Sequence, residues 1–177
     1  RFDTPMLFAL GFITMFMVGG FTGIMHSSVP VDMQQQDTYF VVAHFHYIVY
    51  GGSVFVIFAS IYHWYPKIIG RMLDEHLGRL HFLLTFVGFN LCFAPQHWLG
   101  LNGMPRRVAE YDPQFELVNQ ISSAGALLMA ISTLPFLWNV IASAFYGAIA
   151  GDTPWRALTP EWLPSSPPPL QGVYVSE

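Results

Sequence analysis

Four long stretches of apolar residues, separated by short polar segments, dominate the chain. We expect them to form membrane-spanning helices, because about 20 helical residues cross a hydrocarbon core of roughly 30 Å. The expected helices cover residues 5–25, 38–65, 80–98 and 121–150. Pro66 is expected to end the second helix, and Pro95 to bend or end the third. The predicted fold is therefore an all-α integral membrane segment of four helices, over residues 1–150.

The polar segments between the stretches predict an orientation. Lys67 and two arginines lie in the expected loop between the second and third helices, whereas the loop at 26–37 has neither lysine nor arginine. The positive-inside rule places the first of these loops and both termini on the cytoplasmic side, and the loops at 26–37 and 99–120 on the outer side. Residues 151–177 are rich in proline and lack an apolar period, so we expect an extended cytoplasmic-side tail.

Composition narrows the class of protein. Hydrophobic residues make up 53% of the chain and charged residues 10%, against roughly 25% charged in a soluble domain. This excludes an ordinary soluble enzyme, and a net charge of −4 offers no basic surface for nucleic acid. The single cysteine, Cys92, is expected to be a small buried hydrophobe. Because the chain starts at Arg1 and soon enters an apolar stretch, we expect it to be the C-terminal part of something longer.

Two histidines stand inside the second apolar stretch, where a polar side chain must find a partner. His44 and His46 are two positions apart, roughly 200° around a helix, so their rings should face nearly opposite sides and cannot chelate one ion. Each can hold a centre of its own, and helix-borne histidines are common haem ligands. Two haems would then flank one helix, separated by Phe45 and the backbone. The simpler alternative is two buried histidines that hydrogen-bond neighbouring helices.

The outer loops carry charges that suit this interpretation. Haem propionates should point toward the nearer outer surface, where Arg106 and Arg107 could meet them through charge-assisted hydrogen bonds. Exposed loop charges against lipid headgroups are the alternative for these arginines. Asp32 and Asp37 lie on the same side, where a carboxylate could accept a proton-bearing propionate or bind Mg²⁺. For Asp37 the alternative role is a cap of the second helix.

The stretches DTYFVVAHFHY, HWYPKIIGRM, PQHWLGLNGMPRR and YDPQF resemble subunit I of the haem–copper oxidases, closest to the cyanobacterial type of cytochrome c oxidase. The resemblance runs through nearly the whole chain and implies the C-terminal four-helix part of a twelve-helix subunit I bundle. It implies part of the catalytic subunit of a terminal respiratory oxidase, which reduces O₂ to water with coupled proton translocation. This segment alone is not expected to be active, because the copper ligands and the second ligand of the low-spin haem lie on earlier helices.

The resemblance also implies residue roles. His44 would be the catalytic residue, as ligand of the high-spin haem iron where O₂ binds. His46 would bind the iron of the low-spin haem, and both haems are expected to be a-type. The haem surroundings would be completed by Phe45 between the rings and by Arg106, Arg107 and Asp32 at the propionates.

A magnesium site is the weakest part of this likeness. Asp37 would match an acidic Mg²⁺ ligand of the family, which usually has histidine immediately before it. This chain has Gln36 there, whose amide oxygen can still bind Mg²⁺ but alters the site.

The partners implied by the resemblance are the N-terminal helices of subunit I, oxidase subunits II and III, cytochrome c as donor through subunit II, O₂ and the lipid bilayer. The membrane would be a bacterial plasma membrane or its thylakoid or inner mitochondrial equivalent. Three alternatives stay open: a quinol oxidase of the same superfamily, a non-haem transporter with a histidine proton relay, and an inert fragment that no longer assembles. Visible haem absorption would separate an oxidase from a transporter.

Overall fold

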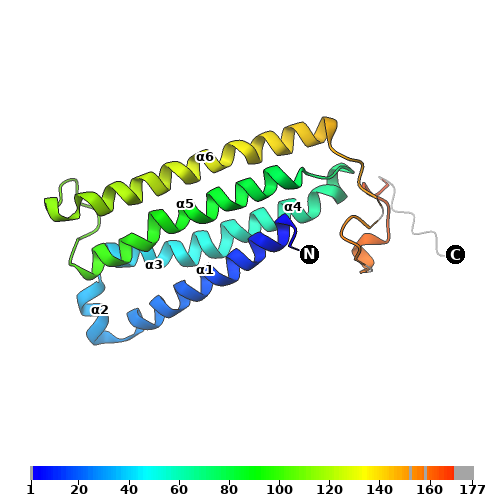
Figure 1. Ribbon diagram of the computed structural model, residues 1–177. Coiled ribbons are helices and arrows are strands. Elements are labelled where there is room, and N and C mark those ends of the chain that lie inside the picture. Colours follow the sequence, from blue (N-terminus) through cyan, green and yellow to red (C-terminus); the bar gives the residue numbers. More distant parts are fainter. Residues whose placement is uncertain (1, 152, 158, 170–177) are drawn as a thin grey trace.

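The computed structural model describes residues 2–151, 153–157 and 159–169. Four long helical segments run side by side and alternate in direction, so that α1 begins at the end of the bundle where α6 ends (Figure 1). The segments are α1 (Thr4–Ser27), the run from α3 (Tyr39–Val49) through η1 (Tyr50–Val54) to α4 (Phe55–Ile69), α5 (Glu75–Leu101) and α6 (Glu116–Tyr146). Each is long and apolar enough to cross a membrane. The predicted all-α fold with four spans is confirmed, while Arg1 lies outside the described residues.

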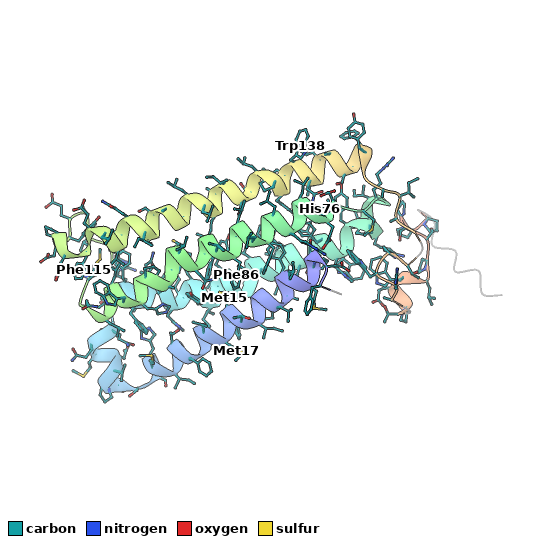
Figure 2. The ribbon with its side chains drawn as sticks, in the orientation of Figure 1. Met15, Met17, His76, Phe86, Phe115 and Trp138 are labelled. Carbon is teal, nitrogen blue, oxygen red and sulfur yellow. The ribbon has the colours of Figure 1, made fainter. Side chains whose placement is uncertain are left out.

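The helices lie in a row, with α5 between α6 and α3, and with α1 against α3 and α4 (Figure 1). α6 therefore leaves much of its surface free. Trp138 points away from the bundle, and Leu134 and Ile141 are also more than half exposed (Figure 2). Such an apolar outer face suits lipid or further protein rather than water.

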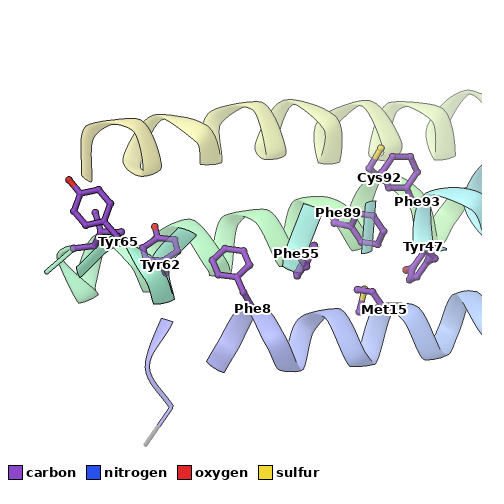
Figure 3. Close-up of a cluster of buried hydrophobic side chains, with 10 residues drawn as sticks. Phe8, Met15, Tyr47, Phe55, Tyr62, Tyr65, Phe89, Cys92 and Phe93 are labelled. Atoms are coloured by element: carbon purple, nitrogen blue, oxygen red, sulfur yellow. The ribbon is translucent and has the colours of Figure 1, made fainter. Parts of the chain in front are cut away.

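Aromatic rings fill the centre of the bundle. Phe8 of α1, Phe55 of α4 and Phe89 of α5 are fully buried and lie in one cluster (Figure 3). The ring centroids of Phe8 and Phe55 are 5.7 Å apart, and those of Phe55 and Phe89 are 6.0 Å apart, in edge-to-face arrangements. Burial of such rings stabilises by about 1.5–3 kcal/mol each in water-soluble proteins, and in lipid their close packing takes over this role. The cluster fixes α1, α4 and α5 relative to one another.

Small residues bring α5 and α6 into backbone contact. A Cβ atom on Gly125 would collide with the backbone nitrogen of Cys92, and one on Gly88 would lie 2.9 Å from the backbone nitrogen of Met129. Hydroxyl groups bridge the same interface, with Thr85 Oγ1 donating to Ser132 Oγ at 2.9 Å. Close approach of small residues and interhelical hydrogen bonds are the usual means of helix association in membranes. Cys92 is buried here, as predicted.

Neither Pro66 nor Pro95 ends its helix. Pro66 lies inside α4, which continues to Ile69 and ends at Gly70, where φ is +77°. Proline removes one N–H donor, but the last turn is completed because Gly70 N donates to Pro66 O at 2.9 Å. Pro95 likewise lies inside α5, which continues to Leu101. The predicted end at Pro66 was therefore wrong, and Pro95 does not end its helix.

The other helix ends extend beyond the apolar windows. α5 begins at Glu75 rather than at residue 80, because Asp74 caps it by accepting a hydrogen bond from Leu77 N at 2.8 Å. Asn139 of α6 supports this cap, since it accepts from Asp74 N and donates to Asp74 O, each at 2.8 Å. α6 begins five residues earlier than expected and ends at Tyr146 rather than at residue 150.

The loop expected at residues 26–37 contains a short helix, α2 (Val29–Gln35). Its local signals are a serine cap position, Ser28, and Pro30 in the first turn, where the missing N–H is tolerated. A second short element, η2 (Pro113–Phe115), precedes α6 at the same end of the bundle. Both elements lie at the end of the bundle where the loop after α5 supplies Arg106 and Arg107 to the candidate site described below.

The described part of the tail is folded back onto α4 rather than extended. It contains η3 (Pro160–Trp162), and Trp162 is only 1% exposed. The Trp162 ring stacks on Trp64 with centroids 5.6 Å apart, and Lys67 Nζ donates to Pro164 O at 2.7 Å. The prediction of an extended tail was wrong for these residues, because burial of the Trp162 ring against α4 outweighs the open conformations that proline favours. Residues 170–177 lie outside the described part.

Candidate functional site

The two intramembrane histidines face different helices. His44 points toward α1, where its Nδ1 lies 3.1 Å from Gly19 O and 2.9 Å from Thr22 Oγ1. The His46 ring lies instead against Phe93 of α5, stacked with centroids 4.0 Å apart. The two rings therefore diverge from α3, as the spacing of two residues predicts.

The hydrogen bonds of these rings leave the same atom available on each. His46 Nδ1 lies 2.8 Å from Val42 O, a carbonyl that can only accept, so the ring nitrogen donates. The same argument applies to His44 and Gly19 O. In a neutral imidazole the other nitrogen then carries the lone pair, and no hydrogen bond to Nε2 of either ring is found within the described residues. Each histidine thus has an Nε2 lone pair that is able to accept a hydrogen bond or bind a metal, with its tautomer set by a backbone carbonyl.

A pocket of about 390 Å³ lies beside His44 at the α2 end of the bundle. Its walls bring together the residues predicted on the outer side, namely Asp32, Gln36, Asp37 and Arg106, with His26 and Val41. Asp32 lies 3.3 Å from the His26 ring, between Oδ1 and Nδ1. The lining is mostly polar and charged, with Val41 as its apolar member, so the pocket offers hydrogen-bonding groups of both signs beside the His44 ring.

Arg106 is placed by backbone pairing between two distant loops. Thr38 and Pro105 form an isolated antiparallel bridge, and Arg106 N donates to Asp37 O at 2.9 Å. The Arg106 side chain follows the same path, with Nε and Nη2 donating to Asp37 Oδ1 at 3.0 and 2.6 Å. This contact was not foreseen, because nothing in either loop specifies pairing with the other.

Asp37 is not the cap of the histidine helix. The cap is Thr38, whose hydroxyl accepts from Phe40 N at 3.2 Å. Asp37 precedes it in the left-handed region, with φ of +59°, and so directs its carboxylate toward Arg106. Capping as the role of Asp37 was therefore wrong by one residue.

Arg107 and Phe45 belong to the opposite side of the helix. A second pocket of about 220 Å³ is lined by both, together with Tyr39, Val42 and Arg106. The Phe45 ring is 39% exposed and lies 4.5 Å from the His46 ring, between centroids. Arg106 alone among the lining residues of these pockets borders both of them.

The described residues fit two haems better than a bare metal ion. No group of three or more His, Cys, Asp or Glu side chains that could hold a metal ion occurs within the described ranges. Asp37 Oδ1 accepts two hydrogen bonds from Arg106, so Mg²⁺ binding by Asp37 and Gln36 would have to displace or share that contact. Single histidines on different sides of α3, with Arg106 and Arg107 lining the neighbouring pocket, are the kind of residues that hold haem.

Sequence reasoning missed the contribution of α1 to this site. Thr22 and His26, one turn apart, both lie beside the His44 ring, the latter with ring centroids 5.0 Å apart. The available signal was the small-residue face of α1, since Gly19 and Gly23 allow close approach of α3.

A scan against protein-family models matches residues 1–128 to the family described as "Cytochrome C and Quinol oxidase polypeptide I". Among curated proteins, "Cytochrome c oxidase subunit 1" of Thermostichus vulcanus is 57% identical over 175 residues, covering 99% of this chain and 32% of that protein. The protein of the same name from Synechocystis sp. is 54% identical over 171 residues, and the match covers 97% of this chain and 31% of the Synechocystis protein.

Similarity extends to a solved structure described as a haem–copper terminal oxidase dimer, with a TM-score of 0.72. It is 23% identical in sequence, and the match covers 82% of this chain and 27% of that chain. At this identity the likeness shows the fold alone. The present chain spans about a third of the length of the curated relatives named above.

Proposed function

Because this chain belongs to the cytochrome c and quinol oxidase polypeptide I family, we propose that it is part of the catalytic subunit of a terminal respiratory oxidase that reduces O₂ to water. Members of this family are integral membrane proteins, and each is one subunit of a larger complex. As the chain covers about a third of its relatives, the activity belongs to the complete subunit with its N-terminal helices, copper ligands and subunits II and III.

One observation carries the proposal. A single helix presents two histidines to different sides, and each ring donates from Nδ1 to a backbone carbonyl so that Nε2 is left as a ligand. The free Nε2 alone does not distinguish these rings, because Nε2 of His26, His81 and His97 also lacks a hydrogen-bond partner within the described residues. The distinguishing feature is that the His44 and His46 rings lie on different sides of one membrane-spanning helix. Haem bound at such nitrogens supplies electron transfer at one centre and O₂ binding at the other.

The chain's own residues have distinct parts in this scheme. His44 holds the high-spin, O₂-binding haem and His46 holds the low-spin haem, with Phe45 between them. Arg106, Arg107 and Asp32 neutralise and orient the propionates, since charged groups in a membrane need partners near the surface. The a-type identity of the haems, coupled proton translocation and a Mg²⁺ ion at Asp37 and Gln36 belong to the same proposal.

Cytochrome c, acting through subunit II, is the proposed electron donor, since the relatives described above are named cytochrome c oxidase subunit 1. The family description also includes quinol oxidases, which makes a quinol the second candidate donor. The termini are proposed to lie on the cytoplasmic side of a bacterial plasma membrane or its thylakoid or inner mitochondrial equivalent, from the lysine and arginine distribution.

Purification of the complete complex containing this segment tests the proposal. Reduced-minus-oxidised spectra and pyridine haemochrome analysis should give two haems for each copy of subunit I. Oxygen consumption should follow reduced cytochrome c rather than quinol. A complex without haem would contradict the oxidase and favour the transporter, while oxygen consumption with quinol alone would reassign the donor.

A further inference from the structure

His44 and His46 differ in what holds them. The His46 ring is anchored by one carbonyl of its own helix, Val42 O at 2.8 Å. The His44 ring is anchored by two oxygen atoms of a different helix, Gly19 O at 3.1 Å and the Thr22 hydroxyl at 2.9 Å. α1 therefore contacts the hydrogen-bonding edge of one iron-ligand candidate and not of the other.

The protons at this junction can be assigned by elimination. Thr22 has one hydroxyl proton, and its Oγ1 donates to Gly19 O at 2.9 Å. The hydroxyl can then only accept from His44 Nδ1, and Gly19 O can accept as well. A ring protonated at Nε2 instead would direct the Nδ1 lone pair at the Gly19 carbonyl lone pairs, which is repulsive. Both oxygens thus select the Nδ1–H tautomer and direct the Nε2 lone pair away from α1.

We propose that Thr22 is a positioning residue, which orients the His44 ring and strengthens Nε2 as a donor to the iron of the O₂-binding haem. This inference rests on the proposed function. Hydrogen bonds to the second nitrogen of a ligating histidine fix its orientation and raise its basicity. Since the anchor is on α1, a shift of α1 against α3 would alter the His44 ligand bond while leaving His46 unaffected.

The packing around Thr22 keeps this anchor close. A Cβ atom on Gly23 would lie 3.1 Å from His44 Cε1, and one on Gly19 would lie 2.7 Å from Ile48 Cδ1. α1 can approach α3 at this level only because both positions lack side chains. Thr22, set between them, is the residue of this turn whose side chain reaches the ring with a polar atom.

Thr22→Val in the complete oxidase tests the proposal, because valine keeps the branched shape and removes the hydroxyl. The readout is the iron–histidine stretching band of the reduced O₂-binding haem in resonance Raman spectra. We expect the band to move to lower frequency and the retention of that haem to fall about tenfold, as is typical for loss of such partners. The optical spectrum of the His46 haem should not change.

Two further variants distinguish loss of the Thr22 hydroxyl from a general disturbance of α1. Thr14→Val is the matched control, because Thr14 lies on the same helix, donates to Leu10 O at 2.9 Å and is exposed. Thr22→Ser retains the hydroxyl and should restore the wild-type band. If Thr22→Val fails to assemble, Thr22→Ala takes its place, with a shift of the band expected relative to Thr22→Ser.

The possible outcomes distinguish a failure of the role of Thr22 from a failure of the proposed oxidase function. An unmoved band in the hydroxyl-free variant, with haem bound, would overturn the role of Thr22 and leave the oxidase proposal intact. Equal shifts in Thr14→Val and Thr22→Val would also overturn it, as a general effect on α1. A wild-type complex with no histidine-bound haem would overturn the proposed function, and this inference with it.

Discussion

Arg106 and Asp37 are joined twice, once through the backbone and once through the side chains. Arg106 N donates to Asp37 O at 2.9 Å, and the guanidinium Nη2 donates to Asp37 Oδ1 at 2.6 Å. The Asp37 side chain is 76% exposed and that of Arg106 only 23% exposed, so the aspartate covers the arginine from outside. The pair therefore holds one positive charge at the rim of both pockets beside the histidine helix.

Removal of that charge should change the redox potential of a bound haem. Arg106→Ala should lower the midpoint potential by tens of millivolts, on the order expected for loss of one nearby cation, because positive charge favours the reduced iron. The measurement is a spectroelectrochemical titration of the complete oxidase. Arg79→Ala is the control, since Arg79 pairs with Glu75 at the other end of the bundle. Equal potentials in wild type and Arg106→Ala would argue against a propionate contact.

A double variant refines this prediction. Asp37 partly offsets the charge of Arg106, so Arg106→Ala combined with Asp37→Ala should shift the potential less than Arg106→Ala alone. The measurement is the same titration. If the double variant shifted the potential as far as Arg106→Ala does, the Asp37 carboxylate would have no effect on the haem potential.

The two histidines should lose different spectroscopic signals. His46→Ala should remove the low-spin haem band, whereas His44→Ala should chiefly abolish CO binding to the reduced enzyme, because each ring is proposed to bind a separate haem on its own side of α3. Absorption spectra of the reduced protein with and without CO measure both. His76→Ala provides the control, as His76 is exposed at the far end of α5 (Figure 2). Unchanged spectra in both variants would refute the ligand assignments.

The contact between α5 and α6 should be sensitive to a single methyl group. Gly125→Ala places a Cβ atom against the backbone at Cys92, which cannot move as a side chain would. We expect a loss of stability of about 1–3 kcal/mol or more, as for overpacked cores. Thermal unfolding in detergent measures this. Gly20→Ala should be neutral, because a Cβ there meets nothing within 4 Å. Equal melting temperatures for both variants would mean that α5 and α6 can move apart to accept the added methyl group at little cost in stability.

The tail should detach when its buried tryptophan is removed. Trp162→Ala eliminates the stacking on Trp64 and the ring beneath Lys67 Nζ, which lies 5.6 Å from its centroid. Loss of about 1.5 kcal/mol of burial corresponds to roughly tenfold faster tryptic cleavage after Arg156. Leu163→Ala should have no such effect, since Leu163 is 77% exposed. Cleavage at the wild-type rate in Trp162→Ala would show that the tail is held by other contacts.

The sequence alone determined the number of long helices, the divergence of the two histidines and the rim position of Arg106 and Arg107. These follow from local quantities, namely apolar length and the angular spacing of residues on a helix. The helix ends were harder to predict from the sequence. The cap formed by Asp74 is supported by Asn139 of another helix, and the helix continues past Pro66 because Gly70 completes the last turn.

Only the tertiary structure decided which partners each side chain meets. It placed Thr22 on His44, paired Asp37 with Arg106, and folded Trp162 onto α4. Each of these contacts joins residues from separate segments, and depends on how closely two helices approach or how two loops align. The distance between two helices is set by small residues such as Gly23 and Gly125, which contact a neighbouring helix. The apolar pattern within a single helix does not indicate which neighbour such a residue will meet.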